Sequence, residues 1–454
     1  MNKKHYKILF IFFSILFFVA APSAIFYAQG YRLDLEERKI VKTGGLFIKA
    51  FPKQCMIYVD DKFAKNTDFI FGEAFIKNLN PKEYKIRVEK SGYFPWKKTL
   101  KVEEELVAKS ENIILFPNPV NFSPVSNKVE NYFFSPDKEK IILEKQGEEN
   151  NYLELINLEE EKRVIISEEE LNGKEIKEVI WNYNSEELLI KTEDEDNIVY
   201  SIIGIITGDL SEMNIELPTS TTELEFNPYN SEELFFIASN SLFKLNFTQE
   251  KEPEKMIENL EDYTIKEREI FWINKEGLIF KSNISSGEKI GIVNNKPLSF
   301  EGKKEIEVLN KEIFIKNNND LYYFDEDKKE FNQIEDHVNK ISLSPDENRI
   351  LITNKHEIYL FFPSEIIEQP RRKENSKVFL TRLSEEIKET SWLNNHYLIF
   401  SSGNKIKITE ADNRDGLNII TIKECENPEI FWDNSRKRVY LLSNGNLYRS
   451  EELF

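Results

Sequence analysis

Two segments, Phe133-Phe134-Ser135-Pro136-Asp137 and Ile341-Ser342-Leu343-Ser344-Pro345-Asp346, carry the pattern that decides the fold of this chain. In each segment apolar residues lead into Ser-Pro-Asp, and an apolar run follows after three further residues, at 141–143 and 350–352. Proline suits the second position of a β-turn because its fixed φ matches the angle required there. Each segment therefore predicts a strand, a tight turn and a second strand that is buried on both faces.

The same pattern recurs in less regular form along most of the chain. An apolar or aromatic pair is followed by a polar turn and then by an apolar run. The further copies begin at Ile180, Phe226, Phe271, Ile306, Trp392 and Phe431. Most copies are followed by a polar turn and a second apolar and aromatic stretch, as in 240–245 and 320–324. Three or more strands in about 35 to 48 residues is the period of a four-stranded propeller blade.

One blade cannot bury both of its faces alone, so an array of such blades must close into a ring. We count eight copies and predict a β-propeller of six to eight blades. A strand within 120–126 is expected to complete the last blade, because the final copy supplies only three strands. The alternative is a flat β-sandwich or two smaller β-domains.

The Ser-Pro-Asp copies resemble the TolB-like and WD40-like propeller repeats. The best matches are Phe134-Ser135-Pro136-Asp137 and Leu343-Ser344-Pro345-Asp346. The glycine that usually follows the aspartate is absent here, and the Gly-His and Trp-Asp pairs of true WD40 repeats do not recur. The resemblance implies a propeller with degenerate repeats.

Residues 43–118 predict a separate small β-domain. Its most regular strand is Tyr84-Lys85-Ile86-Arg87-Val88, where apolar and charged residues alternate so that one face is buried. Further strands are expected around 46–48, 56–59, 75–79, 96–102 and 112–115, with turns at 60–62 and 80–83.

This order resembles the PEGA domain, a small β-sandwich of bacterial and archaeal surface proteins. The resemblance lies in Pro52, Ile57-Tyr58-Val59-Asp60, Asn78-Leu79-x-Pro81-x-x-Tyr84 and Lys90-x-Gly92-Tyr93-x-x-Trp96. The chain departs from the family where Lys53-Gln54-Cys55 replace Glu-Gly-Ala and where Lys82 replaces a glycine. The resemblance implies a spacer or interaction module. We expect Tyr93 and Trp96 to pack in the core beside a turn, with sugar stacking as the alternative.

An uncharged segment, residues 8–28, is long enough to cross a hydrocarbon core of about 30 Å. Lys3, Lys4 and Lys7 precede it, so the positive-inside rule places the N-terminus in the cytoplasm and the bulk of the chain outside. A cleaved signal peptide is the alternative, since small residues lie near its end at 22–24 and 27–28. Both interpretations give the same compartment.

The chain thus divides into a cytoplasmic tip and transmembrane anchor (1–30), a linker (31–42), the PEGA-like domain (43–118) and the propeller (119–454). Its formal net charge of −19 argues against nucleic acid as a partner, because phosphate binding needs a basic surface. Cys55 and Cys425 fall in different predicted domains, so we expect two separate thiols and no disulfide.

Catalytic signals are weak. The four histidines, His5, His337, His356 and His396, form no metal-binding or catalytic motif. The acidic run 193–196 and the segment 412–416 lack the pattern and spacing of a calcium loop. We expect the first to be a solvated turn and the second to be a turn. No catalytic, cofactor-binding or metal-binding residue is predicted, and no cofactor.

We therefore expect an all-β, membrane-anchored, extracytoplasmic scaffold or binding protein of the cell envelope that is not an enzyme. Its predicted partners are the lipid bilayer, through residues 8–28, and an envelope protein or cell-wall polymer at the propeller. The alternative is a propeller-type glycan hydrolase or lyase with an acidic site in its channel. Clustered Asp, Glu, Arg and Tyr at the channel mouth would favour the enzyme, whereas a diffuse or apolar rim would favour the scaffold.

Overall fold

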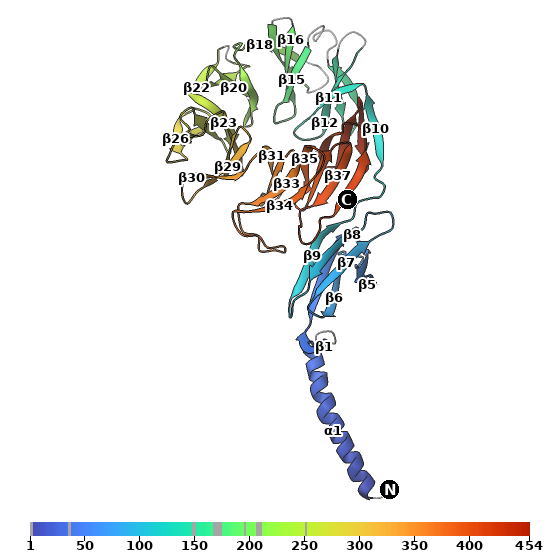
Figure 1. Cartoon of the computed structure of the whole chain (residues 1–454). Helices are drawn as coiled ribbons and strands as arrows, with labels where there is room; N and C mark the ends of the chain where they lie inside the picture. The colour runs from blue at the N-terminus through green and yellow to red at the C-terminus, as the bar shows by residue number, and fades with distance from the viewer. Residues whose placement is uncertain are drawn as a thin grey trace.

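The computed structural model describes residues 3–34, 38–147, 151–166, 175–194, 197–205, 211–249 and 252–454. Within these residues one helix, α1 (Lys3–Ala28), is followed by 41 strands, which confirms the predicted all-β chain with an N-terminal helix. Figure 1 shows the helix, a small β-sandwich and a much larger group of sheets, one after another along the chain.

Helix α1 projects away from the sheets (Figure 1). Its stretch Tyr6–Ala28 has a mean hydropathy of 2.6, and none of it is buried within the protein. The helix is long and apolar enough to cross a membrane, a property that it shares with a signal sequence near the N-terminus.

A β-hairpin joins the helix to the sandwich. Strand β1 (Tyr31–Asp34) pairs antiparallel with β2 (Lys39–Lys42). The base of the hairpin is closed by the Thr43 amide, which donates to the Gly30 carbonyl at 2.9 Å. The Arg32 guanidinium lies 3.5 Å from the centre of the Tyr27 ring, which ties the hairpin to the last turn of α1. The segment expected to be a linker therefore contains a β-hairpin.

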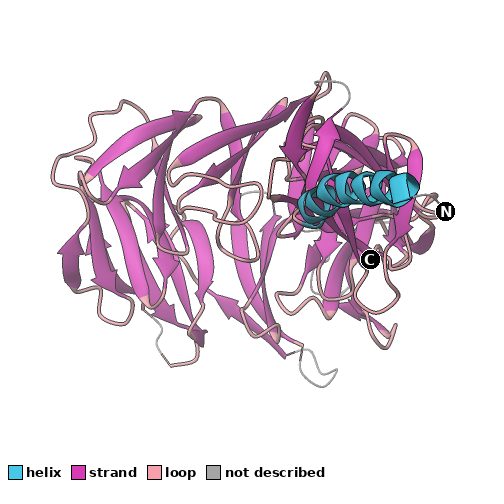
Figure 2. Cartoon of the chain, turned by 90° about the horizontal axis from the view of Figure 1, so that it is seen from below, coloured by secondary structure: helices cyan, strands magenta, loops and turns pink. Residues whose placement is uncertain are grey.

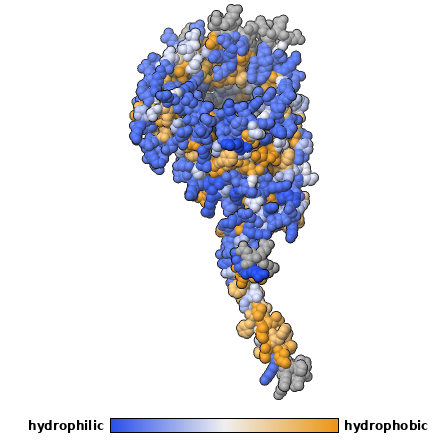
Figure 3. Space-filling view, viewed as in Figure 1, coloured by the Kyte–Doolittle hydropathy of each residue, from blue (hydrophilic) through white to orange (hydrophobic). Residues whose placement is uncertain are grey.

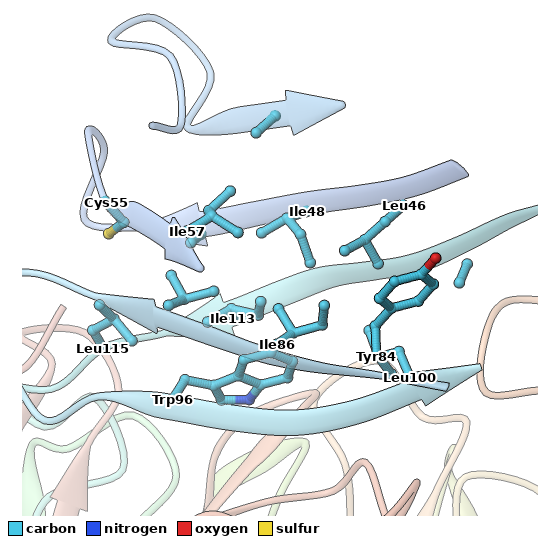
Figure 4. Close-up of a cluster of buried hydrophobic side chains, with 14 of the residues drawn as sticks. Leu46, Ile48, Cys55, Ile57, Tyr84, Ile86, Trp96, Leu100, Ile113 and Leu115 are labelled. Carbon is cyan, nitrogen blue, oxygen red and sulfur yellow. The ribbon is translucent and has the colours of Figure 1, made fainter. Parts of the chain in front are cut away.

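Seven strands form the small β-sandwich. They are β3 (Gly44–Phe51), β4 (Met56–Val59), β5 (Lys62–Asn66), β6 (Glu73–Leu79), β7 (Glu83–Glu89), β8 (Trp96–Lys101) and β9 (Val107–Ile114). Sheets β6-β3-β9 and β5-β4-β7-β8 enclose one core, which includes Ile48, Ile86 and Trp96 (Figure 4). Strand β5 is not among the strands predicted from the sequence, which places only a turn at 60–62. All five of its residues are exposed, so it lacks the apolar alternation that identifies a strand.

Eight four-stranded antiparallel sheets follow, which we number as blades along the chain. Blade 1 is β11 (Val129–Phe134), β12 (Lys140–Lys145), β13 (Tyr152–Asn157) and β14 (Arg163–Ile166). Blade 2 is β15 (Glu175–Trp181), β16 (Glu187–Asp194), β17 (Asn197–Gly204) and β18 (Ser211–Ile215). Blade 3 is β19 (Thr222–Asn227), β20 (Asn230–Ala238), β21 (Ser241–Asn246) and β22 (Glu254–Glu258).

Blade 4 is β23 (Leu260–Lys266), β24 (Glu269–Asn274), β25 (Ile279–Asn283) and β26 (Lys289–Ile292). Blade 5 is β27 (Lys304–Leu309), β28 (Glu312–Asn317), β29 (Asp320–Asp325) and β30 (Glu330–Glu335). Blade 6 is β31 (Val338–Leu343), β32 (Ile350–Asn354), β33 (Glu357–Phe362) and β34 (Ser376–Arg382). Blade 7 is β35 (Ile387–Asn394), β36 (Tyr397–Ser402), β37 (Lys405–Glu410) and β38 (Ile419–Glu424). Blade 8 is β39 (Glu429–Asp433), β40 (Arg438–Ser443) and β41 (Asn446–Ser450), with β10 (Phe122–Asn127) as its fourth strand.

Eight apolar cores join these blades into a closed ring. Each core contains residues from two neighbouring blades, and the eighth core joins blade 8 to blade 1 through Tyr440 and Ile141. Eight sheets with eight shared cores leave no free face between blades. The propeller is therefore confirmed, with eight blades, and the flat sandwich alternative is excluded.

The central strands show why the apolar runs in the sequence are continuous. On β36, Leu398 and Phe400 face the core shared with blade 6, whereas Ile399 between them faces the core shared with blade 8. Successive side chains point to opposite faces of a strand, and here both faces are covered. A run such as 397–400 is therefore apolar at every position.

The Ser-Pro-Asp turns form as expected. The Ser344 hydroxyl donates to Asp346 Oδ1 at 2.6 Å and accepts the Arg349 amide at 3.0 Å, so the side chain closes the turn. The residue after each aspartate has a positive φ, 62° at Lys138 and 59° at Glu347. Glycine adopts this conformation without strain, which explains its usual place in similar repeats.

Blade 8 is completed from both ends of the repeat region. Strand β10 pairs antiparallel with β41, with Phe122 opposite Ser450 and Asn127 opposite Asn446. This confirms the strand expected within 120–126. The Phe134 ring in blade 1 stacks on Phe431 in blade 8 at 3.7 Å, so aromatic contact reinforces the closure. In Figure 2, which views the molecule from below, α1 overlies one side of the sheets.

Replacement of Tyr440 by alanine should destabilise the whole propeller, because Tyr440 is 0% exposed in the core between blades 8 and 1. Loss of a large buried aromatic side chain costs about 3–5 kcal/mol. This is a large share of the about 5–15 kcal/mol that stabilises a typical domain. The measurement is chemical unfolding of the full chain in detergent, followed by near-ultraviolet circular dichroism.

Tyr440→Phe is the matched control, because it keeps the ring and should cost less than about 1.5 kcal/mol. We expect the alanine variant to unfold in one cooperative transition at lower denaturant. An early transition confined to a small part of the signal, with the remainder unchanged, would show that the blades fray independently and that the ring is not a closed unit.

Candidate functional site

At the junction between the sandwich and the propeller, main-chain groups of strand β8 form hydrogen bonds with side chains of a propeller loop. The Lys97 amide donates to Asn418 Oδ1, and Asn418 Nδ2 donates back to the Lys97 carbonyl, both at 2.9 Å. The Thr99 amide donates to Asp415 Oδ2 at 2.8 Å. Strand β8 of the sandwich is thus docked on the loop between β37 and β38 of blade 7.

A buried ion pair lies at the centre of this junction. Lys98 Nζ is 2.7 Å from Glu410 Oε1, and the side chains of Lys98 and Glu410 are 0% and 5% exposed. The other Glu410 oxygen accepts the indole N–H of Trp96 at 2.8 Å. The Asn418 side chain donates to Glu410 Oε1 at 2.7 Å, so both carboxylate oxygens are fully engaged.

Beside this pair lies a small cavity of about 60 Å³ between β9 and the loops of blades 6 and 7. Its lining includes Trp96, His396 and three arginines, Arg349, Arg372 and Arg414. Burial, and then the positive charge of Arg349, lowers the pKa of His396 to about 4. The imidazole is therefore neutral at physiological pH.

Asp412 anchors one of these arginines. The Arg414 guanidinium donates to both Asp412 oxygens, with a shortest distance of 2.6 Å. Burial alone would raise the pKa of Asp412, but the hydrogen bonds from Arg414 and the charge of Lys98 hold it below its ordinary value. Asp412 is therefore an ionised member of the cluster.

A second group of titratable residues lies on the inner strands of the propeller. Strands β23 and β27, and likewise β35 and β39, lie side by side, which places the first strand of each blade at the centre. Burial raises the pKa of Asp262 to about 8 and that of Glu307 to about 7. Inner carboxyl groups with raised pKa values are a feature that the enzyme alternative requires.

Three inner carboxylates are bonded to residues of another blade or of the loop before it. Asp262 Oδ2 accepts the Ile306 amide at 2.6 Å, which links blade 4 to blade 5. Glu389 accepts the Ile430 amide and so links blade 7 to blade 8. Glu223 is paired with Lys303 at 3.3 Å. The cluster therefore serves to connect blades, and this use favours the scaffold interpretation.

The residues singled out from the sequence fall into three groups. Trp96 packs in the sandwich core as expected, but its indole also reaches blade 7. Cys55 and Cys425 are free thiols, in the sandwich core and beside the core of blades 7 and 8 respectively. His337 and His356 lie together in a surface groove, whereas His396 lines the junction cavity.

The two segments expected to be turns behave differently. The run 193–196 includes the last two residues of β16, and its residues 195 and 196 lie outside the described part of the chain. Segment 412–416 lies in the loop between β37 and β38, and its Asp415 bonds an amide that lies 316 residues earlier in the chain. No local sequence pattern predicts a contact between residues so far apart in the chain. Among the described residues, no group of three or more His, Cys, Asp or Glu side chains could hold a metal ion.

Comparison with known proteins gives similarity of structure only. No protein-family model and no curated protein matches the sequence. The Dos1 propeller is similar with a TM-score of 0.46 and 13% identity, covering 73% of this chain and 94% of its own. Kluyveromyces lactis Hsv2 with its complete loop 6CD gives 0.45 and 11%, covering 66% of this chain and 99% of its own.

The dihydro-heme d1 dehydrogenase NirN gives a TM-score of 0.45 and 13% identity, covering 65% of this chain and 66% of its own. At TM-scores below 0.5 none of these likenesses carries a functional conclusion. The propeller assignment rests on the eight sheets and the eight cores that they share.

Replacement of Glu410 by glutamine should loosen the junction, because it removes the nearer of the two carboxylates beside the buried Lys98 ammonium and leaves only Asp412, at 3.9 Å. Breaking one partner of a buried pair costs about 3–5 kcal/mol, whereas replacing both partners by neutral groups is often close to neutral. The double variant Lys98→Met with Glu410→Gln should therefore recover much of the loss. The measurement is limited proteolysis of the full chain near residues 115–121, together with its melting temperature. Equal damage in the single and double variants would rule out the pair as the element that holds the junction.

Replacement of Asp262 by asparagine should flatten the dependence of stability on pH. A carboxyl group whose pKa is raised to about 8 by burial is protonated in the folded protein, whereas the unfolded chain releases the proton near pH 4. Asp262 therefore lowers stability progressively as pH rises from about 4 to about 8. Asparagine still offers an oxygen to the Ile306 amide.

We expect Asp262→Asn to be more stable than the parent at pH 8 by about 1.4 kcal/mol or more, the value of one pKa unit, with the difference fading toward pH 4. Glu258→Gln is the control, because the Glu258 side chain is 75% exposed on β22. Chemical unfolding at pH 5 and pH 8 provides the measurement. An unchanged slope between the two pH values in Asp262→Asn would exclude Asp262 as its source.

Proposed function

We propose that this chain is a single-pass, membrane-anchored scaffold of the cell envelope. Its N-terminus lies in the cytoplasm, and the PEGA-like sandwich holds the propeller outside the membrane at a fixed orientation. The propeller engages an envelope protein or a cell-wall polymer. The proposal treats the protein as non-enzymatic.

The observation that carries the proposal is the exposed apolar helix. Phe10, Phe17 and Phe18 are 73%, 65% and 75% exposed, and no other part of the described chain covers them. Figure 3 shows the contrast between this hydrophobic helix and the largely hydrophilic surface of the propeller. A lipid bilayer is the environment that removes such a surface from water. The lysines that precede the uncharged segment 8–28 support a cytoplasmic N-terminus.

A continuous series of contacts supports the spacer role of the sandwich. The hairpin is tied to α1 by Arg32, and Lys42 pairs with Glu105 of the sandwich at 2.6 Å. The sandwich is in turn docked on blade 7 through Lys98 and Glu410. No stretch of free chain separates the helix from the propeller among these elements. A rigid support of this kind suits a protein that presents a binding surface at a set distance from the membrane.

The glycan hydrolase or lyase is the second candidate, and the inner carboxylates are its motivation. Asp262 and Glu389 are each bonded to a backbone amide of the next blade, and Glu223 is paired with Lys303. A general acid or base must be free to exchange a proton with a substrate. These structural roles favour a scaffold over an enzyme.

The membrane part of the proposal is tested by alkaline carbonate extraction and by protease treatment of intact cells. The full chain should stay with the membrane pellet, and its propeller should be cleaved or labelled from outside. Replacement of Leu16 and Phe17 by lysine should prevent stable insertion, because a charged residue at the centre of a span costs about 2.5–3.5 kcal/mol. A soluble species that begins near Gln29 would instead identify a cleaved signal peptide.

The binding part is tested by capture from solubilised envelope with the full chain in detergent, with bound proteins and bound polysaccharide analysed separately. A partner that binds saturably and is released unchanged supports the scaffold. Shortened or unsaturated glycan products, formed by the parent but not by Asp262→Asn or Glu223→Gln, would instead establish the enzyme.

A further inference from the structure

The β1–β2 hairpin that follows α1 has one apolar face. Leu33 and Ile40 lie directly opposite each other in its register, and they are 62% and 69% exposed. Tyr31 lies two residues before Leu33, so its side chain is on the same face. On the opposite face Val41 is buried, with 2% of its surface exposed. The hairpin thus presents two large aliphatic side chains to its surroundings.

This apolar face is continuous with the apolar surface of α1. The Tyr31 ring meets the Phe26 ring edge to face, with ring centres 5.4 Å apart. Phe26 is 54% exposed and belongs to the stretch Tyr6–Ala28, which is able to span a membrane. Lys42, opposite Tyr31, extends to the sandwich, where it pairs with Glu105 at 2.6 Å. An apolar strip therefore runs from the helix through Tyr31 to the outer part of the hairpin.

The length of the apolar helix places the hairpin at the edge of a bilayer. The stretch Tyr6–Ala28 has 23 residues and spans about 35 Å at 1.5 Å per residue. A hydrocarbon core is about 30 Å thick, so the last turn of α1 reaches the interfacial layer. The hairpin begins three residues after the helix ends, and Arg32 holds it there by donating to the Tyr27 carbonyl at 2.8 Å. Its apolar face is therefore kept in or beside the interfacial layer when α1 spans the bilayer.

We infer that the β1–β2 hairpin is a second membrane contact, in which Leu33 and Ile40 enter the interfacial layer beside the point where α1 leaves the bilayer. The inference rests on the proposed membrane anchor. Tyr27 and Tyr31 suit the same level, because tyrosine is enriched at membrane–water interfaces. Residues 31–42 contain four basic and three acidic residues, so burial of apolar surface, and not lipid charge, provides the attraction.

A contact of this kind restricts the tilt of the whole protein on the membrane. A single span can tilt in the bilayer, and anchors at the interface limit that freedom. The hairpin is also bonded to the sandwich, where the Glu105 amide donates to the Thr43 carbonyl at 3.3 Å. The sandwich is joined to the propeller by the buried pair of Lys98 and Glu410. The lipid contact of the hairpin therefore helps to set the orientation of the propeller above the membrane.

The test is fluorescence of the full chain in phosphatidylcholine liposomes, with the polarity-sensitive fluorophore NBD attached to one introduced cysteine. The two free thiols of the chain, Cys55 and Cys425, are replaced by alanine beforehand. NBD at Leu33→Cys or Ile40→Cys should show blue-shifted emission and strong quenching by lipids that carry a nitroxide on the acyl chain.

Phe69→Cys is the matched control. Phe69 is also 69% exposed, but it lies in a loop that borders a groove beside the propeller. NBD at this position should emit as in water and escape quenching by the lipid. Addition of Ile40→Ser to the labelled Leu33→Cys variant should reduce the lipid quenching, because it removes one of the two aliphatic side chains. Equal quenching with and without Ile40→Ser would overturn the inference.

NBD at Phe17→Cys reports on the anchor separately. Lipid quenching at Phe17 with none at Leu33 and Ile40 would overturn the hairpin contact and leave the anchor intact. Emission as in water at all three positions would reject the anchor, and the hairpin contact with it. Protection of the hairpin labels from a soluble quencher without lipid quenching would assign the apolar face to a second copy of the chain and so overturn the lipid contact.

Discussion

Every blade of the propeller has two apolar faces, and this is the constraint on which the rest of the structure depends. A four-stranded sheet with both faces apolar is stable only between two others, so the array closes into a ring. The ring needs a fourth strand for blade 8, and β10 supplies it from the residues that directly follow the sandwich. The segment that connects the sandwich to the propeller therefore also closes the ring.

Closure and docking are coupled through this short connection. Phe116 and Val120 lie before β10, and both are buried in the core that joins blades 7 and 8. The same stretch leaves the sandwich at Leu115, which belongs to the sandwich core. The buried pair of Lys98 and Glu410 then fixes the angle between the two bodies. A change that opens the ring would also weaken the junction.

Charge is used differently at the centre and at the junction. The chain has a net charge of −19, and its inner strands hold carboxyl groups whose burial raises their pKa. Two inner carboxylates, Asp262 and Glu389, bond backbone amides of the next blade and so connect the blades where they converge. At the junction three arginines and four carboxylates line one small cavity, so charges of both signs lie close together there.

The sequence by itself determined the apolar helix, the strands with regular patterns and the repeat, because each depends on residues close together in the chain. It predicted β10 as the fourth strand of blade 8 from the shortage of one strand in the last copy. It could not reveal β5, which is wholly exposed, or the docking of segment 412–416. Only the tertiary structure brought Lys98 to Glu410, since this environment combines residues hundreds of positions apart. The burial and pairing of a charge depend on such neighbours, and no local pattern encodes them.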